Sequence, residues 1–75
     1  MKVVDQLIRY LRARGSLSSR ELEVALLACR GYTSGRIAQD LRIGVATVKT
    51  HLLHIFTKLS VGSRTELAAL LLRNS

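Results

Sequence analysis

The sequence contains no proline and no tryptophan, and two tyrosines and one phenylalanine are its only aromatic residues. Five glycines are spaced along the chain, and apolar residues recur every three or four positions rather than every second position. This periodicity is typical of helices that bury one side, and no alternating segment predicts a strand. The sequence therefore predicts an all-α fold, and its 75 residues predict a single domain of modest stability.

Cysteine and long apolar segments are also scarce. The only cysteine, Cys29, has no second thiol for an intramolecular disulfide or a multi-cysteine metal site, so we expect it to serve in packing. The chain does not open with the charged and then apolar pattern of a secretion signal. Its longest apolar run, Leu67 to Leu72, is far shorter than the ~20 residues that cross a bilayer. We therefore expect a cytoplasmic protein with no membrane partner.

Acidic residues are few, since 5 Asp and Glu oppose 12 Lys and Arg and give a net charge of +7. No acidic residue lies between Asp40 and Glu66, where the chain carries four cations: Arg42, Lys49, Lys58 and Arg64. Such an excess favours a polyanionic partner, nucleic acid first and an anionic membrane surface second. The alternative is a solvated surface on which the charge run has no function.

The first predicted helix runs from about Lys2 to Arg14 and ends at Gly15. Its apolar residues follow the i, i+3, i+4, i+7 spacing of an amphipathic helix: Val4, Leu7, Ile8 and Leu11. We treat residues 1–15 as a separate segment, which is either an added helix or the end of a linker from another domain. Residues 16–75 form the predicted domain.

Two further helices follow. Ser18 and Glu21 have the spacing of a capping box, which predicts a helix that runs to about Arg30 and ends at a left-handed Gly31. Thr33 can cap the next helix. That helix is expected from Ser34 to Leu41. The expected buried residues of the two helices are Leu22, Ala25, Leu26, Cys29, Ile37, Ala38 and Leu41.

The longest predicted helix runs from about Val45 to Leu59, after a turn at Arg42-Ile43-Gly44. At 3.6 residues per turn one side is apolar, and the residues expected in the core or beside it are Val48, Leu52, Ile55, Leu59, Val45 and Phe56. The opposite side is expected to face outward and consists of Ala46, Thr50, Leu53, His54 and Thr57. Lys49 lies on one flank of this outward side. The other flank carries Thr47, His51 and Lys58.

A second capping-box pattern, Ser63 with Glu66, predicts a last helix that runs to about Arg73. One side of this helix is expected to pack inward through Leu67, Leu70 and Leu71. A second side of mostly small residues would remain exposed in a monomer: Thr65, Ala68, Ala69 and Leu72. Self-association of two copies through this side would cover it.

Two short helices joined by a turn that contains glycine are the layout of a helix-turn-helix, whose second helix enters a DNA groove. The sequence resembles the LuxR/FixJ-type helix-turn-helix family from about Leu17 to Leu71. Five segments carry the resemblance: Leu17 to Val24, Gly31 to Thr33, Ile37 to Leu41, Thr47 to His51, and Lys58 to Arg64. Region 4 of a sigma factor shares the Arg-Glu, Ile-Ala and Thr-Val-Lys pieces, but His51 and the segment from Lys58 to Arg64 favour the first family.

The resemblance implies a four-helix DNA-binding domain of a bacterial transcription regulator, of the kind that forms the output domain of a response regulator. Double-stranded DNA is then the expected partner, and such domains commonly bind operators as dimers. The expected location is the bacterial nucleoid, and RNA polymerase is a candidate further partner. The resemblance also implies an ion pair between Glu21 and Arg64 where two helices of the domain meet.

The helix over 45–59 is the expected recognition helix, and four outward residues are the candidates for base contacts: Lys49, Thr50, Leu53 and His54. Lys49 is the first choice, because an ammonium group can reach guanine O6 and N7. Leu53 either contacts a thymine methyl group or is an isolated apolar residue on the surface. Phosphate contacts are expected from five residues: Thr33, Arg36, Thr47, His51 and Lys58.

No residues suggest catalysis or a cofactor. His51 and His54 have the i, i+3 spacing of a metal pair, but that helix has no cysteine or carboxylate to complete a site. The chain has no catalytic triad arrangement and no phosphate-binding glycine loop, so we expect neither an enzyme nor a cofactor. The remaining alternative is a protein-interaction module that uses its apolar first and last helices as docking surfaces.

Overall fold

The fold is that of a computed structural model, which describes Arg9 and residues 17–73. All regular structure in these residues is helical. The helices with known bounds are α2 (Ser19–Cys29), α3 (Ser34–Leu41), α4 (Val45–Leu59) and α5 (Arg64–Arg73). The predicted all-α class is confirmed for this part of the chain. The predicted N-terminal helix lies outside the described residues apart from Arg9, which is helical and exposed.

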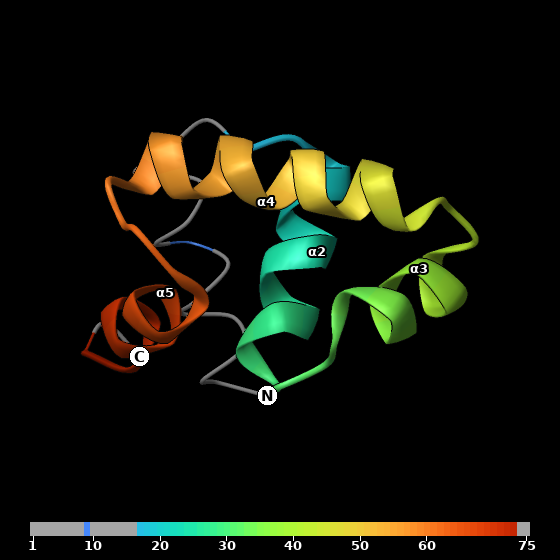
Figure 1. The fold of residues 1–75 in the computed structure, drawn as a ribbon. Coiled ribbons are helices and arrows are strands. Elements are labelled where there is room, and N and C mark those ends of the chain that lie inside the picture. Colours follow the sequence, from blue (N-terminus) through green and yellow to red (C-terminus); the bar gives the residue numbers. More distant parts are fainter. Residues whose placement is uncertain (1–8, 10–16, 74–75) are drawn as a thin grey trace.

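Helix α2 is the centre of the arrangement. Figure 1 shows α4 crossing α2, with α3 and α5 on opposite sides of α2. Apolar residues of all four helices meet between them and form one core: Leu22, Val24, Ala25, Ala28, Ile37, Ala38, Val48, Leu52, Ile55, Leu59, Leu67 and Leu71. Because the inner side of α4 is part of this core, the opposite side of α4 is left on the surface.

The buried side of α2 is broader than the sequence predicted. Leu22 and Ala25 are buried as expected, but Leu26 and Cys29 are only half-buried, and Val24 and Ala28 are buried in addition. A helix that contacts a single neighbour buries one stripe, whereas α2 is contacted by three helices and buries residues on more than one side. Burial raises the pKa of the Cys29 thiol, which keeps it protonated and agrees with a packing role.

The predicted starts of α2 and α3 are confirmed. Ser18 Oγ accepts a hydrogen bond from the Glu21 N–H, and Glu21 Oε1 accepts one from the Ser18 N–H, both at 3.1 Å. Thr33 Oγ1 accepts from the Arg36 N–H at 3.1 Å and caps α3. Gly31 has a φ of +88° just after α2, a left-handed conformation that glycine adopts without a steric penalty.

The capping box predicted at the start of α5 is only half correct. Ser63 Oγ accepts from the Glu66 N–H at 3.1 Å, as expected. The Glu66 carboxylate, however, accepts from the N–H of Gly62 rather than from that of Ser63. A Cβ atom at position 62 would lie 3.1 Å from Glu66 Oε2, so the glycine allows the carboxylate to approach this closely.

Candidate nucleic-acid interface

Helices α3 and α4 are joined by the tight turn at residues 42–44. Arg42 takes the left-handed conformation, with a φ of 57°, and ends α3. Ile43 is half-buried against the core, and Gly44 is the N-cap residue of α4. The side chain of Ile43 therefore anchors the turn, and α3 and α4 pack directly against each other. This is the helix-turn-helix arrangement that the sequence predicted.

The two sides of α4 differ as expected, with one exception. Val48, Leu52, Ile55 and Leu59 are all buried. Val45 is 43% exposed rather than part of the core, because it opens the helix at the end next to the turn and lies beyond the buried stripe. The four residues predicted to contact bases are all exposed on the outer side: Lys49, Thr50, Leu53 and His54. Leu53 is 63% exposed, so most of its side chain faces outward.

Two threonines on the outer side are bonded to their own helix. Thr50 Oγ1 donates to the carbonyl oxygen of Ala46 at 3.1 Å, and Thr57 Oγ1 donates to that of Leu53 at 3.0 Å. With its proton used in this way, each hydroxyl keeps only its acceptor lone pairs for an outside partner, beside an exposed methyl group. Thr50 therefore presents an acceptor and a methyl group to whatever contacts α4.

A buried carboxylate fixes the far end of α4. Glu21 is the one charged residue in the buried core of the described chain, at 5% exposure. Its Oε1 atom lies 2.7 Å from Lys58 Nζ, and its Oε2 atom lies 3.6 Å from His54 Nδ1. One acid on α2 thus holds Lys58 by a hydrogen bond and lies beside His54.

The ion pair between Glu21 and Arg64 that the resemblance implied is wrong. Glu21 pairs with Lys58 instead. Arg64 donates to the carbonyl oxygen of Tyr32 at 2.6 Å and is 3.4 Å from Ser34 Oγ, so it ties the start of α5 to the loop before α3. Arg64 is therefore structural, but through a different partner.

The residues predicted to contact phosphates occupy different settings. Thr33 and Thr47 are exposed near the first turns of α3 and α4, and His51 is half-buried. Arg36 is exposed, lies 3.1 Å from Asp40 Oδ1, and has its guanidinium carbon 5.2 Å from the centre of the Tyr32 ring. Lys58 is held by Glu21 with its side chain 37% exposed. Arg36 and Lys58 are thus available only in part, because each already has an acidic partner.

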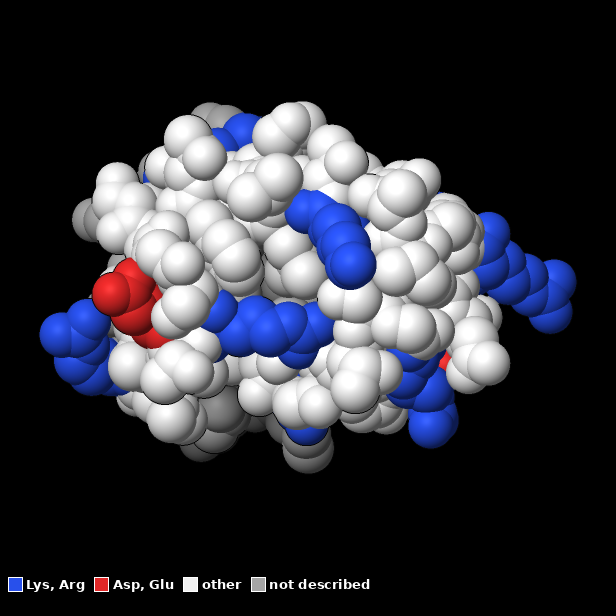
Figure 2. Space-filling model, in the orientation of Figure 1, with Lys and Arg blue, Asp and Glu red and all other residues white. Residues whose placement is uncertain are grey.

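The surface charge agrees with an anionic partner. Helix α4 carries no acidic side chain. Figure 2 shows Lys and Arg side chains scattered over this face of the molecule, mostly below and beside α4, with acidic atoms mainly at one side. Duplex DNA, with one negative charge per about 1.7 Å of its axis, matches such a surface.

The Glu21 carboxylate should also make the stability of the folded domain sensitive to acid. Burial raises its pKa, but the hydrogen bonds from Lys58 and the Ser18 N–H and the nearby His54 outweigh burial and lower the pKa below the ordinary value of 4.5. The stabilisation is complete above pH 4.5 and is lost as the pH falls through the lower value of the folded protein. Glu21→Gln should therefore flatten the fall of the melting temperature below pH 4.5. The control, Glu23→Gln at an exposed acid of α2, should leave that fall unchanged.

The described residues contain no group of three or more His, Cys, Asp or Glu side chains that could hold a metal ion. Among the same residues, no helix is long and apolar enough to cross a membrane.

The α3–turn–α4 unit, with the outer side of α4 exposed, defines a helix-turn-helix domain. Comparison with known proteins agrees: the family of bacterial regulatory proteins called luxR matches residues 15–71. The transcriptional regulatory protein LiaR of Bacillus subtilis (strain 168) is 39% identical over 80 residues, which cover 97% of this chain and 38% of LiaR. The oxygen regulatory protein NreC of Staphylococcus aureus (strain JH9) is 47% identical over 51 residues, 68% of this chain and 24% of NreC. No solved structure matches the chain.

The chain belongs to the luxR family of bacterial regulatory proteins. It is a DNA-binding domain of a transcription regulator and not an enzyme. The family predicted from the sequence is confirmed. The chain spans less than two fifths of the length of either relative described above.

Proposed function

We propose that this domain binds double-stranded DNA sequence-specifically, with α4 in the major groove. The observation that carries the proposal is the outer side of α4, where the four predicted base-contact residues are exposed together on a helix without an acidic side chain. A major groove admits one α-helix, and α3 braces α4 from behind. Binding of operator DNA would also place the protein at the nucleoid, as the output domain of a larger response regulator.

Each exposed residue has a chemical role in this proposal. The ammonium group of Lys49 donates to guanine O6 or N7. Thr50 accepts a hydrogen bond from an exocyclic amino group, since its own proton is used within the helix. Leu53 contacts a thymine methyl group. His54, next to Glu21, reads a base edge.

Phosphate contacts position α4 over the bases. The first turn of α3 offers free backbone N–H groups next to Thr33 and Arg36, and Thr47 lies in the first turn of α4. His51 and Lys58 extend the row of contacts along α4. Because Lys58 has three donors and gives one to Glu21, it can bind a phosphate without leaving its partner.

The salt dependence of binding tests the proposal. With about four phosphates neutralised per protomer, log affinity should fall against log salt concentration with a slope of about −4 per protomer. The measurement is a fluorescence anisotropy titration of a labelled duplex at several salt concentrations. A slope near zero, or no binding to any duplex from a random pool, would contradict the proposal.

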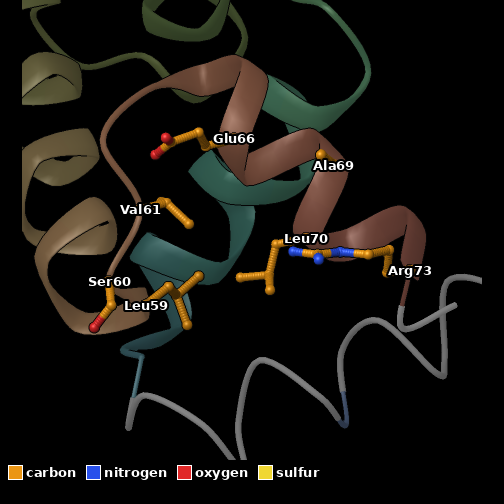
Figure 3. Close-up of a pocket in the computed structure, with 7 residues that line it drawn as sticks. All are labelled: Leu59, Ser60, Val61, Glu66, Ala69, Leu70 and Arg73. Carbon is orange, nitrogen blue, oxygen red and sulfur yellow. The ribbon is translucent and has the colours of Figure 1, made fainter.

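The outer side of α5 is the surface that we propose for the homodimer. Thr65, Ala69 and Leu72 are exposed there, Leu72 by 73%, and Ala68 is half-buried. A hollow of about 360 Å³ lies next to the outer side of α5, between α5 and the end of α4. Ala69 is one of the α5 residues that line it (Figure 3). Two copies joined in this way would present two α4 helices to half-sites about 34 Å apart.

A charge placed on this face should break the dimer. Leu72→Arg is expected to raise the dimer dissociation constant about tenfold or more, because an arginine buried without an acid costs more than the lost leucine contact. Sedimentation velocity over a concentration series measures this constant. Val45→Arg, the same type of change at an exposed position of α4, should leave the dimer intact. An unchanged constant for Leu72→Arg would exclude this face.

A second candidate function is that of a protein-interaction module. One observation favours it, a hollow of about 290 Å³ between α2 and α3 with apolar walls from Leu26, Leu27 and Leu41. RNA polymerase, the candidate further partner, would be one occupant. The Leu27→Asp variant tests this function. If the variant no longer binds RNA polymerase but keeps the wild-type affinity for DNA, the domain has this function in addition to DNA binding.

A further inference from the structure

One edge of the exposed side of α4 is hollowed. Among the described residues, a hollow of about 320 Å³ is lined by four residues of α4: Lys49, Leu52, Leu53 and Phe56. Leu53 is 63% exposed and forms its outer wall, Leu52 is buried, and Phe56 is half-buried against the core. The walls are therefore aliphatic and aromatic carbon, and the ammonium group of Lys49 is the one charged group among the four. Sequence patterning placed Phe56 beside the core and did not suggest this hollow.

We propose that this hollow is a subsite for the 5-methyl group of a pyrimidine in the major groove. The proposal rests on the proposed function and specifies which base the domain selects. Each base pair offers hydrogen-bonding atoms in that groove, and the one apolar group among them is the thymine C5-methyl. Leu53 and Phe56 have no polar side-chain atom, so a base edge gains from them only by presenting a methyl group. Cytosine and uracil, which lack it, would leave the apolar side chains of Leu53 and Phe56 without this contact.

The spacing along α4 also limits how far apart the two contacted bases can lie. Lys49 and Leu53 are four residues apart, or about 6 Å along the helix axis, which is just under two base-pair steps of about 3.4 Å. Lys49 donates to a guanine when Leu53 covers a methyl group, so the two bases lie within a few base-pair steps of each other. The subsite therefore favours half-sites in which a guanine and a thymine lie close together.

Charge argues against a second copy of the chain as the occupant. The chain has a net charge of +7, and no acidic residue interrupts the stretch from Leu41 to Thr65. Two copies joined edge to edge here would bring two Lys49 ammonium groups together with no acid on α4 to offset them. A DNA groove offers negative potential and a methyl group at once.

Single-atom changes in the DNA test the subsite. A duplex selected by the 75-residue protein from a random pool is remade with each thymine of one half-site replaced in turn by uracil, which removes only the methyl group. At one thymine, or at two adjacent ones, affinity should fall about fourfold, equivalent to about 0.8 kcal/mol for one buried carbon. Leu53→Ala should abolish this preference for thymine over uracil, whereas Val45→Ala, an equal kind of truncation on the same helix, should keep it.

A second arm uses cytosine. Where the sensitive thymine is replaced by cytosine, with guanine opposite, methylation of that cytosine at C5 should restore about fourfold in affinity to the wild type and none to Leu53→Ala. Equal affinity for thymine and uracil at every position, or a preference that survives in Leu53→Ala, would overturn the subsite. If the wild type still binds the selected duplex with a salt slope of about −4 in that case, the proposed function stands and only the subsite is lost.

Discussion

Replacing Glu21 by alanine should lower the free energy of unfolding by about 2–3 kcal/mol. The carboxylate is buried, accepts from the Ser18 N–H at the start of α2, and accepts from Lys58 across the core boundary. Alanine removes the cap interaction and the charge-assisted bond together. Lys58 is 37% exposed and can be hydrated again, which keeps the loss at this level. In a domain of this size the melting temperature should fall by about 10–20 °C, measured by circular dichroism.

Two matched variants separate the causes. Glu21→Gln keeps an oxygen acceptor for the Ser18 N–H and removes only the charge, so its loss should be about half as large. Glu23→Ala removes an exposed acid from the same helix and should change the stability by less than about 0.5 kcal/mol. If Glu21→Ala melts like the wild type, the carboxylate does not join α2 to α4 in solution.

Replacing Lys49 by glutamine should weaken binding to the selected operator about 10- to 100-fold per half-site. Removal of one well-placed base contact costs about 1–3 kcal/mol. Lys49 is exposed and has no acidic neighbour on α4, so the Lys49→Gln variant should fold like the wild type. Because the contact is to a base, the loss should be concentrated on sequences with the selected guanine, and binding to unrelated duplexes should change little.

The matched control is Arg30→Gln, which removes one charge from an exposed position at the end of α2. It should leave the discrimination between operator and unrelated duplex unchanged. Equal weakening of Lys49→Gln on all sequences would assign Lys49 to a phosphate instead of a base.

The fold could be predicted because its local signals agree with one another. The bounds of α3 and α4 match the predicted ones, since Thr33, Arg42 and Gly44 mark the ends of helices by short-range backbone geometry. The exposed side of α4 followed from apolar periodicity, because a single helix face packs on α2 and α3. The burial of α2 was predicted less well, because it depends on how many helices surround it.

The partners of Glu21 and Arg64 could not be predicted from pattern alone. Glu21 and Lys58 are 37 residues apart, and their contact depends on the angle at which α4 crosses α2. Arg64 meets the backbone of Tyr32, and a backbone carbonyl leaves no signature in residue identity. Helical periodicity placed His54 on the outward side of α4 and Lys58 on the adjacent flank, so it gave no sign that the two residues face one carboxylate.

The most direct test of the central claim is amide chemical-shift mapping of the isotope-labelled protein with the selected duplex. The outer side of α4 is predicted to contact the bases, so the largest changes should be at Lys49, Thr50, Leu53 and His54, with smaller changes at Thr33 and Arg36. Changes confined to α5 or to the hollow between α2 and α3, with α4 unaffected, would contradict the account.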